Sequence, residues 1–314
     1  MLSAARADRL RPLLDGWLAA ADHAARVASD PVELVRGYRD PLDIEVAGLL
    51  CASLAYGRVD LFKPLLRGLL ARMGPSPAAF CRELSDRTPR PSGAAPQRWA
   101  GLEQFVYRFN VGADIGCLLL ACGDAQRIHG SLGALFARCR EEAASEGTAL
   151  QRFSDWLRGR DFDPVVRRLG PPRALDHLLP TPATGGACKR LNLFLRWMVR
   201  GPDAVDFGLW PVPKSELIVP LDTHLARMAR NLGLTARRDL SWRTADEISR
   251  SLCLLDPDDP VKYDFALCHF GMSGACPPRR RVERCAACPL RGGCLPGQRI
   301  TRLASRIAPA PIFP

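Results

Sequence analysis

Hydrophobic residues recur at helical spacing along most of this chain. The clearest helix is predicted over residues 61–70, where hydrophobic positions fall three and four residues apart and Gly74-Pro75 follows as a stop signal. The same spacing predicts further helices over residues 44–54, 113–122, 132–141 and 145–159. Alternating patterns typical of strands are scarce. We therefore predict an all-α protein.

Two long connections divide the helical pattern. Residues 74–97 and 201–216 are rich in proline and glycine, whereas residues 1–28 alternate charged and apolar positions as an amphipathic helix does. We expect four parts. They are an N-terminal helical segment that packs with the C-terminal part (1–42), a helical barrel-like domain (43–215), a second helical domain with a cysteine cluster (216–300) and a tail (301–314).

Four cysteines near the C-terminus form a candidate metal site. Cys276, Cys285, Cys288 and Cys294 follow the spacing C-x8-C-x2-C-x5-C. Thiolate ligands suit zinc or an iron–sulfur cluster. Structural zinc sites usually contain two short cysteine pairs, and only Cys285 and Cys288 form such a pair here, so a [4Fe–4S] cluster is favoured over zinc. Zinc, or four cysteines without a shared ligand, are the alternatives.

The remaining cysteines lie mostly among apolar residues and show no disulfide framework. They are Cys51, Cys81, Cys117, Cys122, Cys139, Cys188, Cys253 and Cys268. A chain of 314 residues can build a core without disulfides, so we interpret them as small core side chains in a reducing compartment. The sequence shows no signal-peptide pattern and no stretch of about 18 apolar residues. We expect a cytoplasmic monomer that makes no membrane contact.

The chain is strongly basic. Lysine and arginine outnumber aspartate and glutamate by 44 to 33, which gives a formal net charge of +11. Such an excess attracts polyanions, chiefly nucleic acid. Four arginines, Arg279, Arg280, Arg281 and Arg284, lie between the first two cysteines of the candidate metal site, where they could contact phosphates. A solvated run of charge is the alternative interpretation.

A glycine-rich turn precedes a candidate nucleophile. The turn ends in Gly185-Gly186, and a helix is predicted to follow with Lys189 in or near its first turn. Backbone N–H groups of such a turn, and of a helix start, bind phosphate. Helical spacing places Lys189, Asn192, Arg196 and Arg200 on one polar face. A neutral lysine amine can act as a nucleophile, although most lysines on polar faces are only solvated.

A candidate acidic residue opens the next helix. Residues 219–224 read Val-Pro-Leu-Asp-Thr-His, in which proline favours an extended approach and Asp222 or Thr223 is a natural N-cap. The helix should end near Gly233. A capping aspartate can hold the helix with one carboxylate oxygen and direct the other toward a substrate. Capping alone is the alternative.

The order of these motifs resembles a known enzyme superfamily. A glycine turn with Lys189, an Asp-Thr-His string at 222–224 and a cysteine loop are similar to the helix-hairpin-helix base-excision DNA glycosylases, of which endonuclease III is the familiar member. The resemblance covers residues 176–294 and, more weakly, 43–72. Within the superfamily, the strings at 187–192 and 220–224 are typical of a bacterial family of unknown function. Lys189 matches the Schiff-base lysine and Asp222 the catalytic aspartate.

The resemblance implies a fold and a mechanism. It implies the helix-hairpin-helix glycosylase fold of two helical subdomains, a structural iron–sulfur loop at the C-terminus, and activity on duplex DNA that contains a damaged base. Lys189 would attack C1′ of a flipped nucleotide, Asp222 would take up a proton, and the resulting imine would allow strand cleavage. The expected DNA contacts are Gly185, Gly186, Arg190, Arg279, Arg280, Arg281, Tyr56 and Arg58. Core packing is the alternative for Tyr56.

The chain also departs from the superfamily pattern. Its glycine turn is larger, more residues separate Lys189 from Asp222 than in endonuclease III, and the first gap between cysteines is longer. Two other hypotheses stay open for these reasons. One is a non-catalytic DNA-binding protein with a structural or redox-sensing [4Fe–4S] cluster, and the other is an electron-transfer protein.

Overall fold

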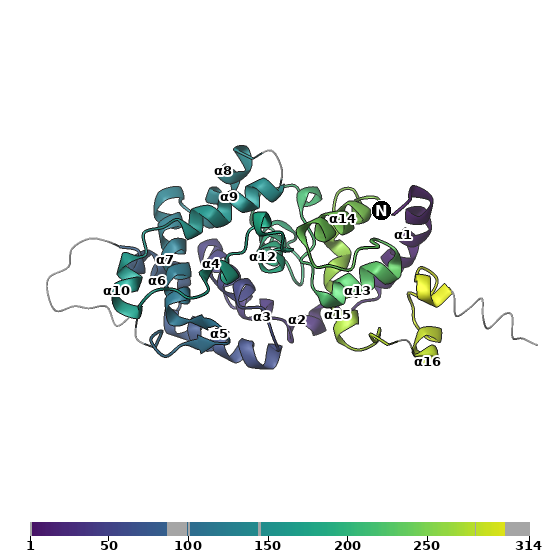
Figure 1. Ribbon diagram of the computed structural model, residues 1–314, viewed down its shortest axis with the longest axis horizontal. Helices are drawn as coiled ribbons and strands as arrows, with labels where there is room; N and C mark the ends of the chain where they lie inside the picture. The colour runs from purple at the N-terminus through teal and green to yellow at the C-terminus, as the bar shows by residue number, and fades with distance from the viewer. Residues whose placement is uncertain (1, 87–98, 100, 144–145, 280, 299–314) are drawn as a thin grey trace, which may run out of the picture. The chain divides into compact units, whose positions relative to one another are not determined.

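The chain folds into helices joined by loops, as the hydrophobic pattern predicts (Figure 1). This computed structural model describes residues 2–86, 99, 101–143, 146–279 and 281–298. Within these ranges the extended structure consists of β1 (Val106–Tyr107) and β2 (Asn110–Val111), which pair antiparallel. The all-α class is therefore confirmed. The chain divides into a central unit, Ala24–Val212, and a terminal unit that combines Met1–His23 with Pro213–Pro314.

The core of the central unit is built around α4 (Pro41–Ser53). Nearly every residue of this helix is buried, and it packs against helices on several sides. These are α3 (Val32–Val35), α5 (Val59–Met73), α6 (Pro77–Leu84), α7 (Gly112–His129), α8 (Leu132–Glu141) and α12 (Lys189–Val199). Gly48 allows the close approach of α12, because a Cβ at this position would lie 3.0 Å from Met198 Cε. The helix that begins with Lys189 is thus packed directly on the core.

The predicted helices of the central unit are confirmed with shifted ends. The 61–70 prediction corresponds to α5 (Val59–Met73), which ends at Gly74 with φ +74°, and the 145–159 prediction to α9 (Glu146–Arg158). The connection predicted over 74–97 is wrong for residues 77–84, which form α6. Ser76 caps this helix, since its side chain accepts a hydrogen bond from Ala79 N, and Pro77 occupies the first turn. The stretch 87–97 lies outside the described residues.

Short elements complete the central unit. They are α2 (His23–Val27), whose first residue belongs to the terminal unit, α10 (Asp163–Leu169), α11 (Leu175–Leu178) and the 3₁₀ helix η2 (Pro182–Thr184). The amphipathic helix predicted over 1–28 is interrupted: α1 (Ala4–Ala19) ends before α2 begins.

The connection predicted over 201–216 is irregular up to residue 213, ends in a short 3₁₀ turn, and is anchored to α12 in its first part. The backbone N–H groups of Phe207 and Trp210 donate to the carbonyls of Trp197 and Met198, at 2.8 and 2.9 Å. The Trp210 indole donates to Glu45 Oε1 of α4 at 2.7 Å. Because α4, the loop and α12 are linked through buried polar contacts, the orientation of α12 is fixed.

The terminal unit contains the predicted Asp222 helix and the cysteine segment. Its remaining elements are η3 (Lys214–Glu216), α13 (Thr223–Leu232), α14 (Trp242–Cys253), η4 (Pro260–Tyr263), α15 (Asp264–Met272) and α16 (Val282–Ala286). The N-terminal helix α1 is held to this unit by Arg6, whose guanidinium donates to Leu232 O at 2.9 Å and to Gly293 O at 2.7 Å. Residues 1–42, which the sequence pattern treats as one segment, are divided between the two units at His23.

No membrane-spanning helix is present in the part of the chain that the structure describes. None of its helices combines the length and the apolar character that crossing a bilayer requires.

Candidate functional site

Lys189 begins α12, directly after the predicted glycine turn. The turn starts with η2, Gly185 adopts φ +80°, and both Gly185 and Gly186 are exposed. A Cβ at Gly185 would meet no atom within 4 Å, so the backbone here is open to approach. Cys188 precedes the helix with φ +48°, which is unusual for a residue other than glycine. The Lys189 amine is half-buried and donates to Ala55 O at 3.4 Å.

The polar face predicted for this helix is not a solvated face. Asn192 and Arg196 are each only 1 % exposed. Asn192 donates to Ala187 O at 3.0 Å, and Arg196 forms an ion pair with buried Asp206 at 3.1 Å. The 201–212 loop folds back onto this side of α12 and supplies Asp206, which is why the face is buried. Burial raises the pKa of Asp206, and the charges of Arg196 and Arg200 oppose that shift.

Arg190 lies in an aromatic cluster of the central unit. Its guanidinium is 2.7 Å from His177 Nδ1 and lies over the Tyr56 ring, 5.2 Å from the ring centroid. Burial lowers the pKa of Arg190 to about 10. Burial, with the charges of Arg190 and Arg108, lowers the pKa of His177 to about 4. The guanidinium predicted to contact DNA is therefore packed against other side chains.

Tyr56 belongs to the same cluster, whereas Arg58 does not. The Tyr56 hydroxyl donates to Asn110 Oδ1 at 2.6 Å, and its ring stacks on Phe109 with centroids 5.5 Å apart. Burial raises the pKa of Tyr56 to about 12. Phe109 remains 46 % exposed. Arg58 precedes α5 on the surface and pairs with Asp60 at 2.6 Å.

Asp222 is the N-cap of α13, as predicted. Its Oδ1 accepts a hydrogen bond from the backbone N–H of Leu225 at 2.7 Å. Its Oδ2 accepts one from the thiol of Cys268 on α15, with Sγ at 3.4 Å. The two carboxylate oxygens are thus held from two helices of the terminal unit. Asp222 belongs to the terminal unit and Lys189 to the central unit. The surroundings of each candidate catalytic side chain are therefore those of its own unit.

The sequence reasoning missed Cys268 as a partner of Asp222. It treated Cys268 as a small core side chain, but the residue is only half-buried and its thiol contacts the carboxylate. Cys253 is also half-buried, whereas Cys51, Cys81, Cys117, Cys122, Cys139 and Cys188 are buried as predicted. His177 and Phe109 were also missed. No local motif marks these residues, because their roles come from contacts distant in sequence.

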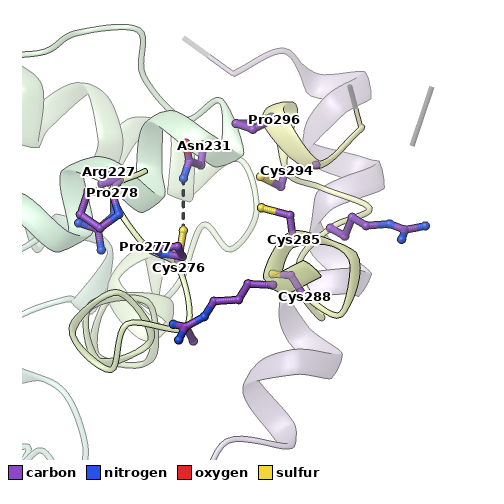
Figure 2. Close-up of a pocket in the computed structure, with 13 residues that line it drawn as sticks. Arg227, Asn231, Cys276, Pro277, Pro278, Cys285, Cys288, Cys294 and Pro296 are labelled. Atoms are coloured by element: carbon purple, nitrogen blue, oxygen red, sulfur yellow. Dashed lines mark hydrogen bonds between the residues drawn. The ribbon is translucent and has the colours of Figure 1, made fainter. Parts of the chain in front are cut away.

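The four candidate metal ligands line one cavity in the terminal unit. The cavity has a volume of about 170 Å³, while a single water needs roughly 10–15 Å³. Figure 2 shows Cys285, Cys288 and Cys294 on one side and Cys276 on the other, where Asn231 Nδ2 donates to Cys276 Sγ at 3.4 Å. Burial raises the pKa of Cys288 and of Cys294, and the neighbouring thiols raise each further.

The cysteines fit an iron–sulfur or zinc site in the kind of donor they offer. All four are thiols at one cavity, and backbone hydrogen bonds from Leu290 and Gly297 reach Cys288 and Cys294, which is the environment that stabilises thiolates in such sites. Among the described residues, no three His, Cys, Asp or Glu side chains lie close enough together to hold one metal ion.

Arginines surround the cavity. Arg227, Arg284 and Arg291 line it, and Arg284 Nη1 donates to Gly274 O at 2.5 Å. Arg279 and Arg281 are exposed on the same segment, while Arg280 lies outside the described residues.

Comparison with known proteins gives one match. A family model described as "Protein of unknown function (DUF2400)" matches residues 30–273, which exclude all four cysteines that line the cavity. A search of curated proteins and a search of solved structures returned no match.

Proposed function

This chain belongs to that family of unknown function, and we propose that it is a base-excision DNA glycosylase with associated lyase activity at abasic (AP) sites. The observation that carries the proposal is the local setting of two residues. Lys189 opens a helix directly behind an exposed glycine turn, and Asp222 opens another helix with both carboxylate oxygens held in place. The order of these two motifs and of the cysteine segment is the order found in the superfamily that the sequence resembles.

The covalent step uses the Lys189 amine. In the proposed reaction a bond forms from Nζ to C1′ of a flipped nucleotide as the bond from C1′ to the base breaks. The base leaves with the bonding electrons and acquires a proton. Loss of a proton from nitrogen and opening of the sugar ring at O4′ then give an imine. Removal of a C2′ proton expels the 3′-phosphate oxygen, which cleaves the strand.

Asp222 is the proposed proton acceptor. Its carboxylate takes the proton that the attacking nitrogen loses, and its negative charge stabilises positive charge that develops on the sugar. The reaction requires both Lys189 and Asp222 at one substrate, so each is essential in this proposal.

Further residues are proposed to hold DNA and to order the terminal unit. The exposed backbone at Gly185 and Gly186 is open to a phosphate, and the exposed Arg279 and Arg281 add positive charge. Cys276, Cys285, Cys288 and Cys294 would hold a [4Fe–4S] cluster or zinc, which when bound would serve as a structural crosslink. Arg190 is proposed to act indirectly, because its guanidinium fixes Tyr56.

A panel of duplex oligonucleotides tests this function. Each carries one oxidised, alkylated or deaminated base, and base release and strand cleavage are measured separately. We expect activity on at least one lesion, abolished by Lys189→Ala and by Asp222→Asn. Lys214→Ala is the matched control, because Lys214 is an exposed lysine outside the proposed site. DNA binding without base release on any lesion would instead support the non-catalytic DNA-binding alternative.

A further inference from the structure

The carboxylate of Asp222 is held by a side chain that the family resemblance does not include. Helix capping uses Oδ1 of Asp222, which accepts a hydrogen bond from Leu225 N. The thiol of Cys268 donates to Oδ2 at 3.4 Å. Oδ2 is therefore the oxygen that capping leaves available for proton uptake. An oxygen of an ionised carboxylate has two lone pairs, so one hydrogen bond from a thiol leaves a second acceptor position.

The helix that carries Cys268 is fixed tightly against α13. Gly271 permits this approach, because a Cβ there would lie 3.1 Å from the Cβ of His224. Arg227 on α13 donates to Gly271 O at 2.8 Å. These contacts lie one helical turn from Cys268 on α15. They therefore fix the distance between Cys268 Sγ and Asp222 Oδ2.

We propose that Cys268 is a positioning residue for Asp222 and fixes the orientation of the proton-accepting oxygen. The proposal rests on the proposed function and deepens it. The thiol has a single proton to donate, so its hydrogen bond orients the carboxylate and leaves the second acceptor position of Oδ2 open. A hydroxyl in the same place would donate more strongly and would hold the carboxylate in its ionised form to lower pH.

The titratable neighbours on the two helices are few. On α13 they are His224, Arg227 and, in the last turn, Arg230, and on α15 they are Asp264, Cys268 and His269. Arg227 is directed to Gly271 O, and the His269 ring packs against Phe265 with centroids 4.3 Å apart. Cys268 is the neighbour with a hydrogen bond to Oδ2 among these residues.

The test compares Cys268→Ala and Cys268→Ser by two measurements. The first is the single-turnover rate of base release as a function of pH. The second is the titration of the Asp222 carboxyl carbon by ¹³C NMR, with the signal assigned by its loss in Asp222→Asn. Cys253→Ala and Cys253→Ser are matched controls, because Cys253 is another half-buried cysteine of the terminal unit and ends α14.

For Cys268→Ala we expect a rate lowered roughly 2- to 10-fold, which corresponds to the loss of one ordinary hydrogen bond. The acidic limb of the rate profile and the NMR titration should both move to higher pH. Cys268→Ser should restore the rate and move both to lower pH. The Cys253 variants should match the wild type.

The proposal is overturned if the wild-type protein releases base but Cys268→Ala leaves its rate and both pH curves unchanged. A lowered rate without any pH shift also overturns it, since that result indicates a structural role alone. If the wild-type protein releases no base from any lesion, the proposed function fails, and the NMR titration alone decides whether Cys268 holds the carboxylate.

Discussion

Replacing Glu45 tests whether a buried carboxylate holds the loop that covers α12. Glu45 is 3 % exposed and accepts three hydrogen bonds. Gly133 N and the Trp210 indole donate to Oε1 at 3.0 and 2.7 Å, and Leu132 N donates to Oε2 at 2.8 Å. Burial raises the pKa of Glu45, and these three donors oppose that shift. Each donor left unsatisfied in the core costs about 1–3 kcal/mol.

The arrangement of donors predicts different costs for two substitutions. In Glu45→Gln, the amide oxygen at the Oε1 position keeps the Gly133 and Trp210 hydrogen bonds, while the amide nitrogen faces Leu132 N. One bond is lost, so the free energy of unfolding should fall by about 1–3 kcal/mol. In Glu45→Ala all three donors lose their acceptor, and the loss should be at least about 3 kcal/mol. This is a large share of the roughly 5–15 kcal/mol typical of a folded domain.

Urea unfolding of the full chain, followed by circular dichroism, measures both losses. Glu142→Gln is the control, because Glu142 is an exposed partner of Arg138 and Arg152, and its change should stay within about 0.5 kcal/mol. Equal losses for Glu45→Gln and Glu45→Ala, or a loss below about 1 kcal/mol for alanine, would refute the assigned donor arrangement.

Three further predictions follow from the site. The pKa of His177 is lowered to about 4 from a usual 6.5, so the folded state binds fewer protons at this residue than the unfolded state does. The free energy of unfolding should therefore fall as the pH drops from 6.5 through 4. His177→Phe should weaken this pH dependence, as thermal melts at several pH values will show. Purified protein should be brown and should contain equal amounts of iron and sulfide. Cys294→Ser should lose both iron and sulfide, whereas Cys253→Ser should retain them. Colourless protein with stoichiometric zinc would favour the zinc alternative. Arg281→Ala should reduce the slope of log K for DNA binding against log salt concentration by about 0.9. Arg250→Ala, which removes an arginine paired with Asp246, should leave this slope unchanged. DNA-binding titrations at several salt concentrations measure both.

Much of the fold could be predicted from periodicity and capping residues. Gly74 ends α5, and Ser76 and Asp222 cap the starts of α6 and α13. Each of these roles depends only on neighbours within a few residues, so a local sequence pattern can reveal it. The α6 helix was missed although Ser76-Pro77 is a recognisable helix start. The abundance of proline and glycine over 74–97 outweighed that signal.

The surroundings of the site could not be predicted, because they depend on contacts between distant segments. The burial of Arg196 arises from Asp206, which a loop brings back onto α12. Arg190 looks like a surface charge in the sequence, yet His177 and Tyr56 enclose it. Cys268 gains its importance only because α15 packs beside the start of α13.

Trapping with sodium borohydride tests the central claim most directly, since hydride reduces an imine to a stable amine. With a damaged duplex as substrate, the account predicts a covalent protein–DNA adduct that peptide mass spectrometry locates on Lys189. Lys189→Ala should abolish it and Lys214→Ala should not. An adduct on another residue, or equal adduct in Lys189→Ala, would contradict the assignment of Lys189 as the nucleophile.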